Sequence, residues 1–180
     1  MEYVVLVNQN DEEIGVEEKM KAHKEAKLHR AFSLFVFNSS GELLIHQRAA
    51  SKYHCPNLWT NAVCSHPRQN ERLVDAVKRR SLEEIGLKVV PTKIFDFIYK
   101  ASFENGLTEH EFDHVFWAET DDLPVLCKTE VQAYRYTTFE TIESEIETQP
   151  ELFTVWFKEA LPMVKEKWLA QKTEKLKANL

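Results

Sequence analysis

Residues 70–86, NERLVDAVKRRSLEEIG, are the segment that most restricts how this chain can fold. Apolar residues recur there at helical spacing, at positions 73, 74, 77, 82 and 85, and charged residues occupy most of the remaining positions. Gly86 follows where a helix commonly ends in a left-handed residue. The pattern predicts one amphipathic helix that packs against the rest of the domain.

Strand patterns lie on both sides of this helix. Residues 3–7 are rich in β-branched residues, and residues 31–48 contain two apolar runs separated by NSSGE, which predicts a hairpin. Residues 93–103 and 107–119 flank an Asn-Gly pair, the strongest short hairpin signal. Further strands are expected in LWTNAVCS and VQAYRYTTF.

The C-terminal part, from TIESEIE onward, has a helical pattern, with Pro150 and Pro162 expected to bound or bend its pieces. No repeat or linker divides the chain. We therefore expect residues 1–180 to form a single α+β domain with a mixed β-sheet between helices.

Composition excludes several classes of protein. With 43% hydrophobic and 29% charged residues, the 180-residue chain resembles an ordinary globular domain. A net charge of -6 argues against a nucleic-acid coat, and no apolar run approaches the roughly 20 residues of a membrane span. Its three cysteines form no CxxC pair, and the start MEYVVLVNQNDEE has no signal-peptide pattern. We expect a cytoplasmic monomer that binds neither nucleic acid nor membrane.

Two sets of chemically useful side chains stand out from this background. Glu109 and Glu111 lie two apart in a predicted strand, so both carboxylates share a face, roughly 7 Å apart, within reach of one ion. With His23, His29 and His66 they make a mixed nitrogen and oxygen donor set. Such a set suits Mn, Fe or Zn better than it suits a structural zinc finger, which would want thiolates.

The segment SHPRQNERLVDAVKRRSLEEIGL resembles the Nudix signature. Six residues match it in register: Glu71, Arg79, Glu83, Glu84, Gly86 and Leu87. Three depart from it: Ser65 replaces a glycine, Arg80 the first glutamate of the helical core, and Ser81 a hydrophobic residue. In Nudix hydrolases these glutamates gather divalent metal ions, a hard-oxygen arrangement suited to Mg²⁺. Arg80 removes a ligand and adds a cation, which favours holding a diphosphate intact.

The wider pattern resembles type I isopentenyl-diphosphate delta-isomerase, a Nudix-fold enzyme, over nearly the whole chain. The motifs are LHRAFSLFVFN, RAASK, WTNAVCSHP, TEHE and a late tryptophan in FTVWF. The spacing from His23 to His29 is one residue shorter than in the bacterial family form. The resemblance implies interconversion of isopentenyl and dimethylallyl diphosphate by adding and removing protons at the carbon-carbon double bond.

The same resemblance implies roles for individual residues. One divalent metal, Mn²⁺, Zn²⁺ or Mg²⁺, would be held by His23, His29, His66, Glu109 and Glu111. Cys64 and Glu111 would be catalytic. Glu84 would help to hold a second ion, Mg²⁺, bound with the substrate diphosphate.

The proposed chemistry needs further groups. Tyr99 lies on the strand predicted to pair with TEHE and is expected to hydrogen-bond to Glu111. Trp156 offers an aromatic face to a carbocation, although a core tryptophan is the ordinary interpretation. The candidates for binding the diphosphate are cationic: Lys19, Arg48, Lys52 and Arg80.

Rival interpretations remain for the pair formed by Cys64 and His66 and for the function of the chain as a whole. A metal-bound His66 cannot deprotonate Cys64, which argues against a cysteine hydrolase. A Nudix pyrophosphohydrolase of a nucleotide diphosphate is the main alternative, disfavoured by Arg80 and by the extra histidines. A catalytically dead Nudix-fold binding module is disfavoured because the whole set of expected site residues is intact.

Overall fold

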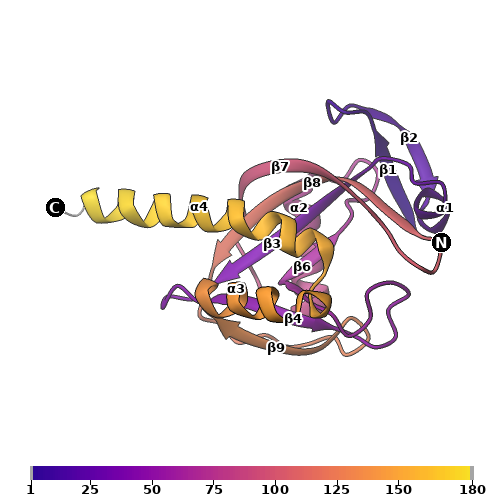
Figure 1. The fold of residues 1–180 in the computed structure, drawn as a ribbon. Coiled ribbons are helices and arrows are strands. Elements are labelled where there is room, and N and C mark those ends of the chain that lie inside the picture. The colour runs from indigo at the N-terminus through magenta and orange to yellow at the C-terminus, as the bar shows by residue number, and fades with distance from the viewer. Residues whose placement is uncertain (1, 179–180) are drawn as a thin grey trace.

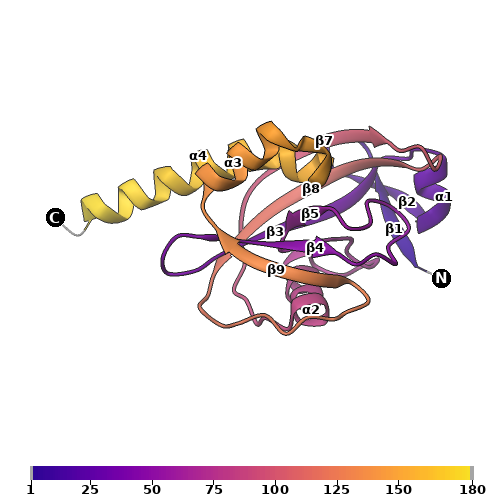
Figure 2. The same cartoon turned by 60° about the horizontal axis from the view of Figure 1, so that its bottom comes forward.

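The computed structural model describes residues 2–178 and shows a mixed β-sheet with helices on both faces (Figures 1 and 2). The elements are, in chain order, β1 (Tyr3–Val7), β2 (Glu13–Glu18), α1 (Lys19–Lys24), β3 (His29–Phe37), β4 (Leu43–Arg48), β5 (Trp59–Asn61), β6 (Val63–Ser65), α2 (Leu73–Ile85), β7 (Thr92–Ser102), β8 (Thr108–Glu119), β9 (Val131–Thr137), α3 (Phe139–Thr148), a 3-10 turn (Pro150–Leu152) and α4 (Val155–Ala178).

Strand β3 is the centre of the sheet. Along one edge it pairs in parallel with β8, from His29 opposite Glu111 to Phe37 opposite Glu119. Along the other edge it pairs in turn with β1, β6 and β4, all antiparallel. Strand β7 pairs with β8, and β9 and β5 pair with β4. Both faces of β3 are covered, which explains its nearly continuous apolar sequence.

The alternation of side chains along β3 divides the core into two layers. Phe32, Leu34 and Val36 pack with residues of α2, whereas Phe35 and Phe37 pack with α3 and α4. Figure 2 shows α2 on one side of the sheet and α3 and α4 on the other. The predicted α+β class, a mixed sheet between helices, is confirmed.

The segment LWTNAVCS forms two strands where one was expected. Strand β5 pairs with β4 and β6 pairs with β3, so the chain changes partner at Ala62. The Asn61 side chain donates to the carbonyl oxygens of Leu34, at 3.2 Å, and Val63, at 2.8 Å. These bonds satisfy backbone groups at the crossing. Beyond it, Cys64 lies opposite Ser33 and packs against the core layer of α3 and α4.

Two further elements matter for the site. The short helix α1 falls within a stretch interpreted from sequence simply as polar and basic, and the Glu18 carboxylate caps it by accepting from the amides of Met20 and Lys21.

In the C-terminal part, Pro150 begins the 3-10 turn between α3 and α4, while Pro162 lies inside α4. Among the described residues, no helix combines the length and apolarity needed to cross a bilayer.

Candidate active site

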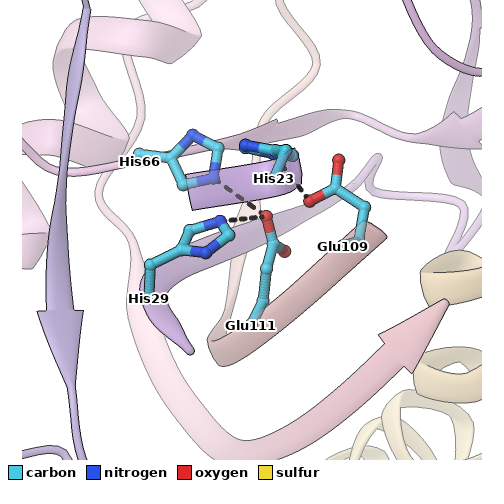
Figure 3. Close-up of side chains that lie close together, drawn as sticks. All are labelled: His23, His29, His66, Glu109 and Glu111. Atoms are coloured by element: carbon cyan, nitrogen blue, oxygen red, sulfur yellow. Dashed lines mark hydrogen bonds and ion pairs between the residues drawn. The ribbon is translucent and has the colours of Figure 1, made fainter. Parts of the chain in front are cut away.

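Five side chains from four separate segments meet near the start of β8. His23 comes from α1, His29 begins β3, His66 follows β6, and Glu109 and Glu111 lie on β8. One nitrogen or oxygen atom of each lies within 4.8 Å of the others. Figure 3 shows the rings and carboxylates gathered together. The structure thus brings the whole predicted donor set, including His23, into one cluster of five residues, the donor group.

Backbone carbonyls hold two of the rings in a fixed orientation. The Nδ1 atom of His23 lies 2.6 Å from the Lys19 carbonyl oxygen, and that of His29 lies 2.8 Å from the Lys27 carbonyl oxygen. Because a carbonyl accepts, each Nδ1 carries the proton, and in a neutral ring each Nε2 presents a lone pair. Such an anchor on the far nitrogen is typical of histidines that bind metal ions.

Three of the atoms that crowd together in this group lack hydrogen bonds. Within the described residues, His23 Nε2, His29 Nε2 and Glu109 Oε2 are buried without a hydrogen-bond partner. His23 Nε2 nevertheless lies 3.0 Å from Glu109 Oε2. Buried polar atoms are normally satisfied, so unsatisfied donor atoms crowded this closely suggest a cation as their common partner.

Charge in this buried region points the same way. Burial alone raises the pKa of Glu109, but His23 and His54 outweigh it and hold the pKa well below its ordinary value. Glu111 shows the same balance: burial and the charge of Glu109 raise its pKa, and His29 and His66 bring it below the ordinary value. Two carboxylates and three imidazoles form a donor set compatible with a divalent metal ion.

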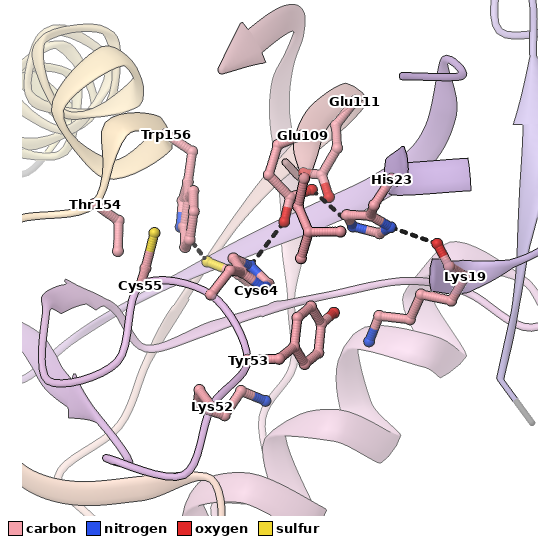
Figure 4. Close-up of polar contacts among 12 residues, drawn as sticks. Lys19, His23, Lys52, Tyr53, Cys55, Cys64, Glu109, Glu111, Thr154 and Trp156 are labelled. Atoms are coloured by element: carbon pink, nitrogen blue, oxygen red, sulfur yellow. Dashed lines mark hydrogen bonds and ion pairs between the residues drawn. The ribbon is translucent and has the colours of Figure 1, made fainter. Parts of the chain in front are cut away.

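Cys64 lies beside this group, on β6. Its thiol donates to Asn61 Oδ1 at 2.9 Å. It accepts from Trp156 Nε1, also at 2.9 Å (Figure 4). Burial, reinforced by the charge of Asp113, raises the pKa of Cys64 to about 12, which keeps the thiol protonated. His66 Nε2 lies 2.9 Å from Glu111 Oε1, so the ring is engaged by the carboxylate. This arrangement differs from a nucleophilic cysteine and histidine pair.

Tyr99 occupies the position expected for it. It lies opposite Glu111 in the antiparallel pairing of β7 and β8, and its hydroxyl donates to Glu111 Oε2 at 2.6 Å. Burial and the charge of Glu111 raise the pKa of Tyr99 well above its ordinary value. The phenol therefore stays neutral and can donate a hydrogen bond to the carboxylate.

The four predicted cations all line a cavity of about 40 Å³ that also contacts Cys64, Tyr99, Glu109, Glu111 and Trp156. Lys19, Lys52 and Arg80 also line an adjoining cavity of about 790 Å³. A small space lined by Cys64, Tyr99 and Glu111 thus lies next to a larger space whose lining includes five lysines and arginines together with three glutamates. This division fits a substrate with a small reacting end and an anionic end.

Each of these cations already has protein partners. Lys19 pairs with Glu2 at 2.9 Å and Lys52 with Glu130 at 2.6 Å. Arg48 donates to the carbonyl oxygens of His54 and Cys55, both at 3.1 Å, and so binds its own loop.

Sequence comparisons identify the family. The NUDIX domain family matches residues 27–157. A protein of Pectobacterium atrosepticum named isopentenyl-diphosphate Delta-isomerase is 42% identical to this chain, over 95% of it and 96% of the relative. One of the same name from Burkholderia multivorans is 46% identical over 87% of this chain and 89% of the relative. This chain belongs to the isopentenyl-diphosphate Delta-isomerase family.

Solved structures agree with this assignment at the level of the fold. The protein DR0079 from Deinococcus radiodurans superposes with a TM-score of 0.76 at 21% identity, covering 90% of this chain and 98% of that one. A MutT protein from Methanosarcina mazei gives a TM-score of 0.65 at 16% identity, covering 78% and 94%. This member of the isomerase family therefore has the Nudix fold.

The signature helix α2 shows how this isomerase-family chain departs from the Nudix pattern. Arg80 donates to Glu84 Oε1 at 2.6 Å and lies 3.5 Å from Glu130 Oε1. Glu84 is buried, its pKa is raised by that burial, and it lies outside the group of five. Ser81 is fully buried and donates to the Leu87 carbonyl oxygen, at 3.0 Å, which explains why a small polar residue is accommodated there.

Two residues of this site were not predicted from the sequence of the isomerase-family chain. Glu130 joins Lys52 and Arg80 and had no feature that set it apart from other surface carboxylates. His54 lies 2.7 Å from Glu109 through its Nε2 atom and lines the smaller cavity. Its place in the loop KYHCPNLW gave no periodicity from which a contact could be inferred.

Proposed function

We propose that this protein interconverts isopentenyl diphosphate and dimethylallyl diphosphate, with the reacting alkene in the smaller cavity. The observation that carries the proposal is that the Cys64 thiol and the Glu111 carboxylate line one cavity, whose lining also includes the four predicted cations. The substrate has no acidic group near its double bond. A thiol and a carboxylate that line one small space are suited to adding and removing protons there.

The reaction adds one proton and removes one. A proton added to the terminal alkene carbon produces a tertiary carbocation, and loss of a proton from the carbon nearer the diphosphate leaves dimethylallyl diphosphate. Cys64 and the pair of Glu111 and Tyr99 supply the two exchange points. Because the interconversion is reversible, the group that donates in one direction accepts in the other.

The carbocation must be stabilised and kept from water. Trp156 is 3% exposed and lines the cavity, and its N–H is held by Thr60 Oγ1 at 3.0 Å and by Cys64 Sγ. This fixes the indole beside the reacting space, where its π face can stabilise a cation by about 2 kcal/mol when water is absent.

We assign the group of His23, His29, His66, Glu109 and Glu111 to one divalent ion, Mn²⁺, Zn²⁺ or Mg²⁺. When bound, that ion would neutralise buried carboxylate charge and lower the pKa of groups it contacts. A second ion, Mg²⁺, would accompany the diphosphate near Glu84, while Lys19, Arg48, Lys52 and Arg80 would bind the phosphate oxygens. For Lys19, Lys52 and Arg80 such contacts would exchange the present carboxylate partners for the diphosphate.

We further infer a monomer acting on a free small molecule without nucleic acid or membrane, because one chain supplies every group named. A catalytic thiol at Cys64 must stay reduced, which the cytoplasm favours.

An assay with isotope-labelled isopentenyl diphosphate and Mg²⁺ tests this function. Dimethylallyl diphosphate is an allylic ester that ionises in acid, so an acid-labile labelled product reports isomerisation. We expect activity in the wild type and in the Cys127→Ser control, and at least a roughly 100-fold loss in Cys64→Ala. Phosphate released before acid treatment would favour the pyrophosphohydrolase instead, and no turnover of any diphosphate would favour the binding module.

A further inference from the structure

His54 lies outside the group of five yet contacts it directly. It belongs to the loop between β4 and β5, is 9% exposed, and places Nε2 at 2.7 Å from Glu109 Oε1. The other oxygen of the same carboxylate, Oε2, lies 3.0 Å from His23 Nε2. Glu109 therefore presents one oxygen to the donor group and the other to His54.

The direction of this contact follows from the chemistry of the two groups. An ionised carboxylate only accepts hydrogen bonds, so His54 Nε2 must carry a proton and donate it. Arg48 Nη2 also lies 3.5 Å from this nitrogen. The Nε2 proton cannot go to Arg48, because a guanidinium does not accept hydrogen bonds. Arg48 Nη2 donates to the His54 carbonyl oxygen, at 3.1 Å.

The His54 ring is held by neighbours on several sides. Ring centroids lie 4.5 Å away for Tyr53, 5.9 Å for Phe103 and 5.9 Å for Trp156. Arg48 holds the backbone at the same residue. A ring fixed in this way can restrict the rotation of the Glu109 carboxylate that it contacts.

We propose that His54 is a positioning residue that orients Glu109 for metal binding. The hydrogen bond to Oε1 keeps Oε2 directed at the donor group, and the contact with Trp156 links that orientation to the wall of the reacting space. This inference rests on the metal site of the proposed function. Outer hydrogen-bond partners of this kind typically change metal affinity by about 10–100-fold.

Two substitutions separate the hydrogen bond from the packing. His54→Phe keeps an aromatic ring and removes the donor, whereas His54→Gln removes the ring but places an amide N–H near the position of Nε2. We would titrate chelator-treated protein with Mn²⁺ and follow free Mn²⁺ by electron paramagnetic resonance. Far-ultraviolet circular dichroism would show that each variant is folded.

The expected result is an Mn²⁺ dissociation constant about 10–100-fold higher than the wild type for His54→Phe, and within about threefold of it for His54→Gln. Wild-type affinity in His54→Phe would overturn the proposal, and so would equal losses in both variants. Failure of the wild type to bind Mn²⁺ would overturn the metal site and this inference together. Isomerase turnover, measured separately, tells such a failure apart from failure of the proposed function.

Discussion

At the scale of single residues, the site depends on which ring nitrogen carries the proton. His23 and His29 each donate a hydrogen bond from Nδ1 to a backbone carbonyl oxygen, and so each directs Nε2 into the donor group. Chain geometry supplies these carbonyl partners, because Lys19 is one helical turn before His23 and Lys27 is two residues before His29. Sequence alone indicated the residue types, whereas the backbone partners needed the fold.

His46, away from the donor group, shows what burial does to a histidine. It is 3% exposed, its Nδ1 lies 3.0 Å from the Ala62 carbonyl oxygen, and burial, reinforced by Arg48, lowers its pKa to about 3. In the unfolded chain its pKa is about 6.5. Between these values the unfolded state binds more protons, so the contribution of His46 to stability falls as the pH falls.

This predicts a measurable pH dependence of unfolding. Between pH 7.5 and pH 5 the wild type should lose about 2 kcal/mol more stability than His46→Asn, whose amide can still donate to the Ala62 carbonyl. Urea unfolding at the two pH values measures the difference. Equal losses in the two proteins would show that His46 can be protonated in the folded state.

Some residues of the site could be predicted and others could not. Glu109 and Glu111 share a face by strand alternation, and the contact of Tyr99 with Glu111 followed from an expected strand pairing, which the structure confirms. His54 and Glu130 reach the site from irregular segments. Their contacts depend on how those segments fold back, which no local pattern encodes.

At the scale of elements, α2 is joined to the chain that follows it at its C-terminal end. Gly86 has φ of 68°, and the Val125 amide donates to the Ile85 carbonyl oxygen at 2.8 Å. A Cβ atom on Gly86 would lie 2.8 Å from the Val125 Cβ and 2.9 Å from its carbonyl oxygen. The glycine therefore serves both the left-handed turn and the close approach.

Substitution should distinguish the two effects. Gly86→Ala is expected to destabilise the protein by about 1–3 kcal/mol more than Gly106→Ala, because overpacking adds to the strain of the left-handed backbone. Gly106 is the matched control, with φ of 79° and no atom within 4 Å of an added Cβ. Urea unfolding measures both. A similar cost for the two variants would mean that the segment at Val125 yields without loss.

The elements themselves were predicted unevenly. The Asn-Gly hairpin and α2 had strong local signals, and both are present. The division of LWTNAVCS into β5 and β6 was not predicted, because a change of partner strand at Ala62 depends on two distant strands. The helix α1 was missed because its six residues are too few to show a helical period.

At the scale of the whole molecule, the donor group joins α1, β3, the loop after β6 and β8. An ion bound there would cross-link segments that are far apart in sequence. A ligand that binds only the folded state at about 100 times its dissociation constant stabilises it by about 2.7 kcal/mol. For a chain of this size that corresponds to a rise in Tm of roughly 5–10 °C.

Metal removal tests this cross-link. Treatment with a chelator should lower Tm by that amount, and added Mn²⁺ should restore it, as followed by circular dichroism. Glu111→Gln is the control, because loss of one charged ligand should reduce the Mn²⁺-dependent shift. An unchanged Tm in chelated wild type, or an equal shift in Glu111→Gln, would contradict the assigned site.

The central claim is that the groups around Cys64 and Glu111 exchange protons with an alkene. Proton NMR of the wild type with isopentenyl diphosphate and Mg²⁺ in D₂O tests it most directly. The account predicts that dimethylallyl signals appear and that the new methyl group carries deuterium taken from solvent. Unchanged substrate, hydrolysis to isopentenyl phosphate or alcohol, or a dimethylallyl product without deuterium in that methyl group would contradict it.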